Sequence, residues 1–152
     1  MARIIKTLIQ KRVSDIDMFQ HVNNVSQQMY FDLGKADFYR QAVSLPAALR
    51  PMIRAIRQVL QDDVLSGTSR IITAATANSF KEQIRMEDDI YVTTTVAKVG
   101  NKSITLFQQI IGRNAAGRET VKTESTSVMV AFDFDRQESV TVPERWRRNL
   151  AD

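Results

Sequence analysis

The segment SDIDMFQHVNN, residues 14–24, contains two aspartates, the only histidine of the chain and two asparagines. An alternating apolar segment, Arg3–Val13, precedes it, and an apolar segment with helical spacing, Val25–Ala42, follows it. We therefore expect a strand, a polar turn and a helix, in that order. The first backbone N–H groups of a helix have no partner inside the helix and attract negative charge. The turn thus places titratable side chains beside a helix end that favours anions.

The predicted helix over Val25–Ala42 is apolar on several sides, as is usual for a buried helix. Its apolar residues at intervals of four and three are Val25, Met29, Leu33 and Ala36. Its aromatic residues, on other faces, are Tyr30, Phe31, Phe38 and Tyr39. Asn23 or Asn24 is expected to cap the helix, because an asparagine oxygen accepts an N–H of the first turn. Gly34 costs about 1 kcal/mol in helix propensity, which predicts a close packing contact there.

The rest of the chain predicts a second helix, four strands and a terminal helix. Apolar residues at helical spacing predict a short helix over Leu45–Asp63. Segments rich in Ile, Val, Thr and Phe predict strands over Val64–Phe80, Ile90–Val99, Ser103–Gly112 and Glu119–Phe132. Tight-turn signals between the last three strands predict an antiparallel meander. Pro143 is expected at the first position of a short helix that ends at Leu150. The order of elements indicates an α+β protein with a helix packed on an antiparallel sheet.

Composition narrows the classes of function. The apolar fraction of 43% and charged fraction of 25% are ordinary for one globular domain, expected over residues 1–152. The absence of cysteine excludes disulfides and thiolate chemistry, and a single histidine argues against a metal site, so no metal or cofactor is expected. No signal-like or membrane-spanning segment is apparent, which favours a cytoplasmic protein. The net charge of +4 is mild and no basic run alternates with aromatic residues, so nucleic-acid binding is not expected.

The stretch DIDMFQHVNNV, residues 15–25, resembles the signature of the hotdog-fold acyl thioesterases. The similarity is to the 4-hydroxybenzoyl-CoA thioesterase-like group and to the acyl-ACP thioesterases. The other resembling segments are Tyr30–Asp32, Met86–Val92, Val96–Ser103, Phe132–Asp133 and Val142–Glu144. The resemblance implies a hotdog fold, in which a curved antiparallel sheet wraps a long buried helix. It also implies a homodimer or homotetramer with active sites at the subunit interface.

The resemblance further implies hydrolysis of an acyl-CoA or acyl-ACP thioester to a carboxylic acid and a thiol. Asp17 matches the catalytic carboxylate, which acts as a general base or as a nucleophile. The N–H groups around Asn24 and Val25 are expected to polarise the thioester carbonyl. His21 and Asn24 are expected to support this geometry. His21 either orients the loop and bonds the ligand or transfers a proton.

Other candidate residues follow from the same pattern. The expected substrate contacts are Asp15, Asn23, Val25 and Gln28. Asp15 has an alternative role in hydrogen bonding the turn, and Asp32 and Asp37 are alternative catalytic carboxylates on the helix. The candidate partners for the phosphates of CoA or of a carrier protein are Arg85, Lys98, Lys102 and Arg113.

Two further functions compete with thioester hydrolysis. Phe19 and the pair Gln27–Gln28 depart from the residues usual in the family, which leaves open a hotdog protein that binds acyl thioesters without hydrolysing them. The hotdog hydratases carry an Asn-Pro and a five-residue step from Asp to His. Here the step to His21 is four residues from Asp17 and six from Asp15, and the Asn-Pro is missing.

Overall fold

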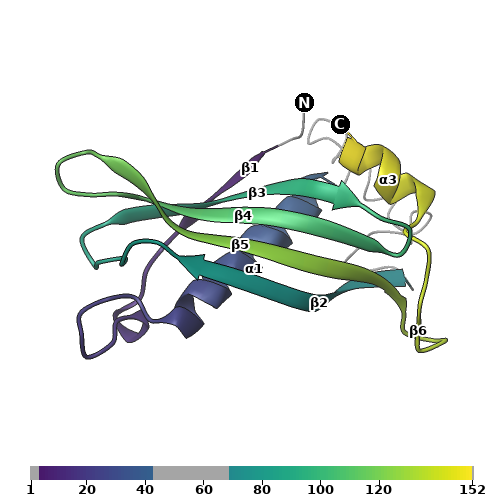
Figure 1. Cartoon of the computed structure of the whole chain (residues 1–152), viewed down its shortest axis with the longest axis horizontal. Coiled ribbons are helices and arrows are strands. Elements are labelled where there is room, and N and C mark those ends of the chain that lie inside the picture. Colours follow the sequence, from purple (N-terminus) through teal and green to yellow (C-terminus); the bar gives the residue numbers. More distant parts are fainter. Residues whose placement is uncertain (1–3, 43–68, 152) are drawn as a thin grey trace, which may run out of the picture.

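The computed structural model describes residues 4–42 and 69–151. They form one antiparallel sheet with a long helix, α1, across one face (Figure 1). The strand order is β1-β3-β4-β5-β2, with the short β6 paired to β5. The strands are β1 (Ile5–Ile9), β2 (Ser69–Phe80), β3 (Asp89–Val99), β4 (Ser103–Arg113), β5 (Glu119–Asp133) and β6 (Glu138–Ser139). The helices are the 3₁₀ turn η1 (Val13–Asp15), α1 (Asn24–Ala42) and α3 (Glu144–Ala151).

The predicted meander is confirmed, because β3, β4 and β5 pair in sequence as antiparallel neighbours. Along β4, residues alternate strictly between buried and half-buried positions until the last residue. The buried set of β4 faces α1, and we call this side of the sheet the inner face. It consists of Ile104, Leu106, Gln108, Ile110 and Gly112. This period of two is what a strand with one covered face requires.

The apolar core divides into two clusters of buried residues. The first joins the inner face to α3 and the end of α1, and includes Phe38, Leu106 and Trp146. The second lies under the start of α1 and includes Val22, Phe31 and Ile110. The helix α3 therefore closes one end of the sheet, and the turn over residues 14–24 lies at the other end (Figure 1).

The helix α1 is not buried on all its apolar sides. The aromatic residues face the sheet, and Phe31 and Phe38 are completely buried. The apolar stripe picked out by its spacing is instead exposed, with Val25 72% and Leu33 56% accessible. The expectation of a fully buried helix is therefore wrong for this face. Spacing shows that a face is apolar, but only packing shows which apolar face contacts the sheet.

The close contact expected at Gly34 is confirmed. A Cβ at this position would lie 2.7 Å from Cγ1 of Val92 and 2.9 Å from Nε2 of Gln108. The helix backbone therefore approaches the sheet at a distance that only glycine allows.

Some predicted boundaries change. The first strand ends at Ile9 rather than Val13, because the chain turns into η1, where the Arg12 N–H donates to the Asp15 carboxylate. Pro143 precedes the terminal helix rather than occupying its first position. Its carbonyl accepts the Arg147 N–H. The predicted helix over Leu45–Asp63, and the part of the predicted strand before Ser69, lie outside the described residues.

Candidate active site

The turn over residues 14–24 is held in place by backbone pairing at both ends. Ile16 pairs with Val22, and His21 pairs with Arg85, which lies far along the chain. The Val22 N–H donates to the Ile84 carbonyl at 2.8 Å. Gln20 adopts a positive φ of 64°, which closes the tight loop between Asp17 and His21. The turn is therefore fixed against the segment that joins β2 to β3.

Asp17 lies inside this loop. Its Oδ1 atom accepts the Phe19 N–H at 2.9 Å and the His21 N–H at 3.3 Å. Its backbone N–H donates to the His21 carbonyl at 2.9 Å. These bonds use one carboxylate oxygen, and the other receives no hydrogen bond from the described residues. The side chain is half-buried and thus held in one orientation with one oxygen available.

Asp15 has a different environment, because only 1% of it is exposed. Its carboxylate accepts hydrogen bonds from the Tyr30 hydroxyl at 2.5 Å and from Ser26 at 3.1 Å. The Arg12 guanidinium pairs with it at 3.0 Å. Burial alone would raise the pKa of Asp15, but the hydrogen bonds from Tyr30, Arg12 and Ser26 outweigh it and lower the pKa to about 2. Asp15 is thus a buried, ionised anchor of the turn.

The start of α1 is capped by Asn23. Its Oδ1 accepts the Ser26 N–H at 2.8 Å, and its Nδ2 donates to the Asp15 carbonyl at 3.0 Å. Of the two asparagines proposed as caps, Asn23 therefore takes this role. The N–H groups of Asn24 and Val25 precede the first intrahelical hydrogen bond, so they have no partner inside the helix. They remain as donors for a negative group at this helix end.

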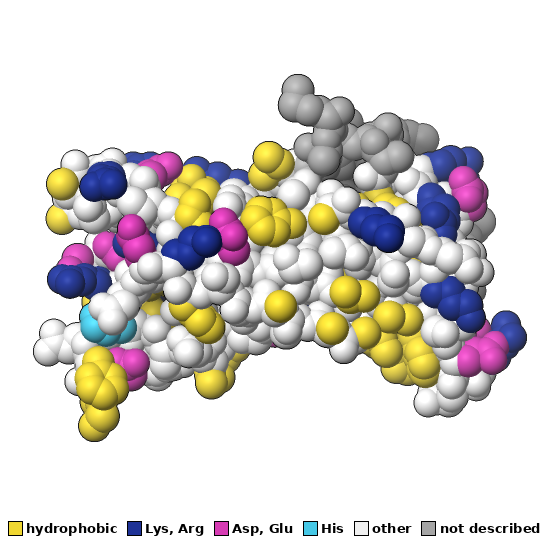
Figure 2. Space-filling view, viewed as in Figure 1, with side chains coloured by type: hydrophobic (Ala, Val, Ile, Leu, Met, Phe, Trp, Pro, Cys, Tyr) yellow, Lys and Arg dark blue, Asp and Glu magenta, His cyan; other side chains and the backbone are white. Residues whose placement is uncertain are grey.

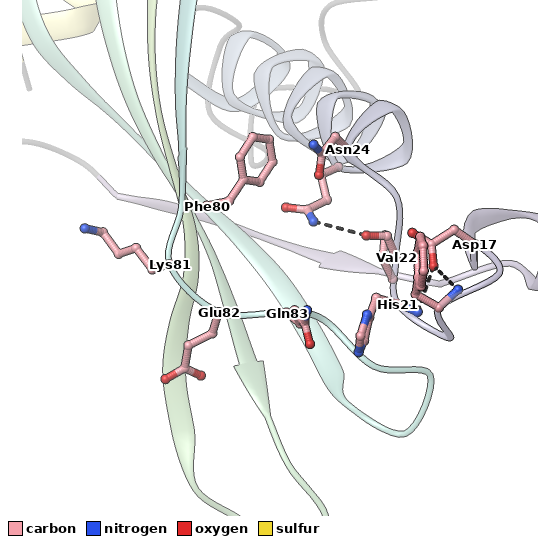
Figure 3. A pocket seen from close by; sticks show the side chains of 10 residues that line it. Asp17, His21, Val22, Asn24, Phe80, Lys81, Glu82 and Gln83 are labelled. Atoms are coloured by element: carbon pink, nitrogen blue, oxygen red, sulfur yellow. Dashed lines mark hydrogen bonds between the residues drawn. The ribbon is translucent and has the colours of Figure 1, made fainter.

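A pocket of about 360 Å³ lies between this turn and the end of β2 (Figure 3). The turn and α1 contribute Asp17, Phe19, His21, Val22, Asn24 and Gln27. The segment at the end of β2 contributes Phe80, Lys81, Glu82 and Gln83. The imidazole of His21 makes no hydrogen bond with the described part of the chain, so it is available to a ligand.

Glu82 is the second carboxylate of the pocket, but it is already engaged. It accepts hydrogen bonds from Thr120 at 2.7 Å and from Lys122 at 3.2 Å. These two hydrogen bonds lower its pKa. Asp17 is thus the carboxylate of the pocket that is held by backbone N–H groups alone.

Apolar side chains remain exposed around the pocket. Phe19 is 72% accessible and Phe80 is 48% accessible. In Figure 2 the histidine lies at one end of the molecule, next to exposed hydrophobic side chains. Large exposed aromatics at a pocket are typical of a surface that is covered by a ligand or a partner.

A sequence model of the thioesterase-like superfamily matches residues 12–150, which is nearly the whole chain. The chain belongs to this superfamily. No curated protein sequence matches it.

Solved structures of similar fold support the hotdog architecture of this superfamily member. A predicted thioesterase from Bacillus stearothermophilus superposes with a TM-score of 0.76 at 21% identity, over 98% of this chain and 95% of that one. The 4-hydroxybenzoyl-CoA thioesterase from Pseudomonas sp. strain CBS-3 gives 0.75 at 14% identity, over 97% and 99%. The protein SAV2348 from Staphylococcus aureus, solved in complex with CoA, gives 0.73 at 14% identity, over 99% and 84%. The predicted hotdog fold is therefore confirmed.

The structure brings the three predicted catalytic residues of this thioesterase-like chain together. Asp17, His21 and Asn24 all line the pocket. The predicted substrate-binding residues are not among its lining residues. They are Asp15, Asn23, Val25 and Gln28. Asp15 and Asn23 hold the turn and the helix start, and the hydrogen bond between Gln28 and Asn78 links α1 to β2.

The alternative carboxylates and the predicted phosphate ligands are not among the residues that line the pocket. Asp37 accepts a hydrogen bond from Thr7, and Asp32 pairs with Lys35 on the same helix. Neither of them lines the pocket. Two of the basic candidates, Arg85 and Arg113, lie at the end of the sheet that carries the turn, and Lys98 and Lys102 lie at the other end.

The far wall of the pocket, Phe80–Gln83, was not predicted from the sequence. Its only sequence signal was a charged segment between two strands, which indicates a loop and nothing more. Its position depends on the pairing of His21 with Arg85 across more than sixty residues.

Two classes of feature are missing from the described ranges, 4–42 and 69–151. They contain no group of three or more metal-ligating side chains. They also contain no helix with the length and hydropathy that a bilayer crossing needs.

Proposed function

We propose that this protein hydrolyses acyl-CoA thioesters to a carboxylic acid and CoA. The observation that carries the proposal is the Asp17 carboxylate, fixed by two backbone N–H groups in a pocket beside the start of α1. Membership in the thioesterase-like superfamily supports it. The name of one structural neighbour includes 4-hydroxybenzoyl-CoA, and another neighbour was solved with CoA.

In the proposed reaction the thioester carbonyl lies between Asp17 and the helix start. The N–H groups of Asn24 and Val25 stabilise the negative charge that develops on the carbonyl oxygen. The free oxygen of Asp17 takes a proton from water as the water attacks the carbonyl carbon. The tetrahedral intermediate then expels the CoA thiolate, which receives the proton. Direct attack by Asp17, through an anhydride that water hydrolyses, gives the same products.

We also propose that a second copy of the chain completes the site. The edge strand β2 pairs only with β5 among the described strands, so its other edge offers free backbone groups. Phe19 and Phe80 leave apolar surface at the pocket close to this edge. Pairing β2 of two copies joins the two sheets and covers this surface, as the predicted homodimer requires.

The decisive experiment measures thiol release from acyl-CoA thioesters of different chain length, with wild type, Asp17→Asn and Glu82→Gln in parallel. Asp17→Asn should lower kcat/KM by about 10²- to 10⁴-fold, the usual contribution of a general base. Glu82→Gln is the matched control, a carboxylate of the same pocket, and should retain activity within about threefold.

Two results would contradict the proposal. Equal losses in both variants would show that Asp17 has no special role. Thiol release that is missing for every acyl-CoA, while the same thioesters bind, would favour a non-catalytic binder. An acyl-ACP substrate in the same assay tests the carrier-protein alternative.

A further inference from the structure

A buried lysine lies behind the far wall of the pocket, which is formed by residues 80–83. Lys122 of β5 is 7% exposed and is not among the residues that line the pocket. Its Nζ atom lies 3.2 Å from Oε2 of Glu82 and 3.7 Å from Oδ2 of Asp88, a carboxylate that is only 3% exposed. A buried ammonium group needs such partners, because an unpaired charge is strongly unfavourable away from water. Lys122 thus joins the wall to a second carboxylate further along the chain.

The backbone of Lys122 holds the same wall. Its carbonyl accepts the N–H groups of Lys81 and Glu82, at 2.8 Å and 3.0 Å. Both of these residues line the pocket (Figure 3). The carbonyl of Lys122 therefore fixes the backbone of the wall, and its ammonium group fixes the side chain of Glu82.

Asp88 connects Lys122 to the turn over residues 14–24. The Oδ2 atom that faces Lys122 also accepts the N–H of Arg85 at 2.9 Å. Arg85 forms the β-bridge with His21 that holds the turn in place. Lys122 is therefore linked to the reactive turn through Asp88 and to the opposite wall of the pocket through Glu82.

A second cavity, of about 310 Å³, lies on the other side of the wall. Gln83 lines both cavities, and Lys122 and Asp88 line the second one. The wall is thus a partition between two open spaces, and its far side faces polar and charged side chains instead of the apolar core. Its position therefore depends on hydrogen bonds and ion pairs, which Lys122 supplies from both its backbone and its side chain.

The sheet departs from regular pairing and packing where it directs Lys122 to these partners. Val121 and Thr123 pair with consecutive residues of β4, so Lys122 is left without a partner in that ladder. Such a bulge changes the direction of a side chain. A Cβ at Gly112 of β4 would lie 2.6 Å from Cε and 3.1 Å from Cγ of Lys122. The missing side chain at Gly112 therefore leaves the space that the lysine stem occupies.

We propose that Lys122 is a positioning residue, which sets the distance between the turn that carries Asp17 and the opposite wall of the pocket; this inference rests on the proposed hydrolysis of acyl-CoA. Lys122 acts through Glu82 and Asp88 and does not line the pocket itself. A misplacement of about 1 Å in a reacting group can lower a rate by about 10²-fold. Replacing a buried ion pair by apolar groups is often neutral for stability, so the alignment of the site is the property that should depend on Lys122.

The first test removes the ammonium group. Lys122→Met keeps most of the stem, and the double variant Lys122→Met, Asp88→Asn also removes the buried carboxylate that would lose its cation. In both, kcat should fall about 10- to 100-fold while KM stays within about threefold, because alignment is lost and no substrate contact is removed. Asp88→Asn alone should retain kcat within about threefold, because its amide oxygen still accepts from Lys122 and Arg85.

The second test displaces the ammonium group without changing any charge. Gly112→Ala places a Cβ where the stem of Lys122 lies. It should lower kcat in the same direction, again with little change in KM. Combining Gly112→Ala with Lys122→Met should lower kcat no further than Lys122→Met does, because both act through the same group.

The matched control is Lys35→Met. Lys35 is a second buried lysine, 5% exposed, which pairs with Asp32 along α1 and does not line the pocket. This variant should leave kcat within about threefold, since it does not contact the wall. Equal losses of kcat in Lys35→Met and Lys122→Met would overturn the inference. So would variants of Lys122 and Gly112 that lower the free energy of unfolding but leave kcat of the folded protein unchanged.

The ring of His21 gives a measurement that does not depend on turnover. It is the only histidine of the chain, so its ring C–H signals can be identified directly by NMR. Lys122→Met and Gly112→Ala should shift these signals, and Lys35→Met should not. If wild type releases no thiol but the signals respond in this way, the proposed hydrolysis is wrong and the positioning role stands. With an active wild type an unchanged kcat overturns the inference, and with an inactive wild type unchanged His21 signals do.

Discussion

At the scale of single residues, Asp15 and Asp17 belong to one turn but differ in their hydrogen-bond partners. Asp15 is buried and its pKa is lowered from 3.8 to about 2 by Tyr30, Arg12 and Ser26. A carboxyl with a lowered pKa in the folded state stabilises the fold above its unfolded pKa, and this stabilisation is lost as the pH falls from about 4 to 2. The shift corresponds to about 2 kcal/mol.

Replacing Asp15 by Asn should therefore lower the free energy of unfolding by about 2 kcal/mol at pH 7. The difference from wild type should narrow as the pH falls from 6 towards 2, measured by urea unfolding at each pH. Tyr30→Phe removes one hydrogen bond from the carboxylate and should weaken the same pH dependence without abolishing it. A difference that stays constant over this pH range would show that Asp15 does not act through its charge.

At the scale of an element, the packing of α1 depends on Gly34. Alanine at this position gains about 1 kcal/mol in helix propensity. Its Cβ would however lie 2.7 Å from Cγ1 of Val92, which is fully buried. Overpacking of this kind costs about 1–3 kcal/mol. Gly34→Ala should thus lower the free energy of unfolding by roughly 1 kcal/mol in denaturant titrations.

A second substitution tests the cause of this loss. Val92→Ala removes the atom that the new Cβ would meet. In the double variant, the substitution at Gly34 should therefore cost less than it does in wild type, which is the coupling that a double-mutant cycle measures. Additive effects of the two substitutions would contradict steric conflict between these residues.

At the scale of the whole molecule, the edge of β2 that no described strand covers predicts the assembly. We expect sedimentation to give a dimer or a multiple of it. Ala75 and Ala77 are both exposed on β2. The double variant Ala75→Lys, Ala77→Lys should bring like charges of the two copies against each other and shift the protein to monomers. Thiol release should fall at least tenfold, because the pocket then stays open to water.

Thr126→Lys provides the control for this change. Thr126 is exposed on β5 directly opposite Ala77, but both edges of its strand are already paired. This variant should keep the assembly and the activity of wild type. A monomeric wild type with full activity would show that no second copy is needed.

The local part of the site was predictable from the sequence. Asp17, His21 and Asn24 lie within eight residues of each other, and a tight turn before a helix brings such residues together. The strands β3, β4 and β5 were predictable for the same reason, since β-branched residues and turn signals act over short distances. The fold class followed from the order of these elements.

Contacts between residues far apart in the chain decided which face of α1 is buried and which residues complete the pocket. The sequence shows that α1 has two apolar faces, but the packing of Phe31 and Phe38 on the sheet leaves Val25 and Leu33 exposed. Phe80–Gln83 join the pocket only because the turn pairs with Arg85. Thr94, Gln108, Ser125 and Asn78 are scattered polar residues in the chain and become one row only when four strands are aligned. A shift of one residue in any pairing would move a member to the other face. Local sequence therefore predicts the elements and the turn that carries Asp17 and His21, whereas the tertiary structure decides which side chains line the pocket, because strand pairing joins residues far apart in the chain.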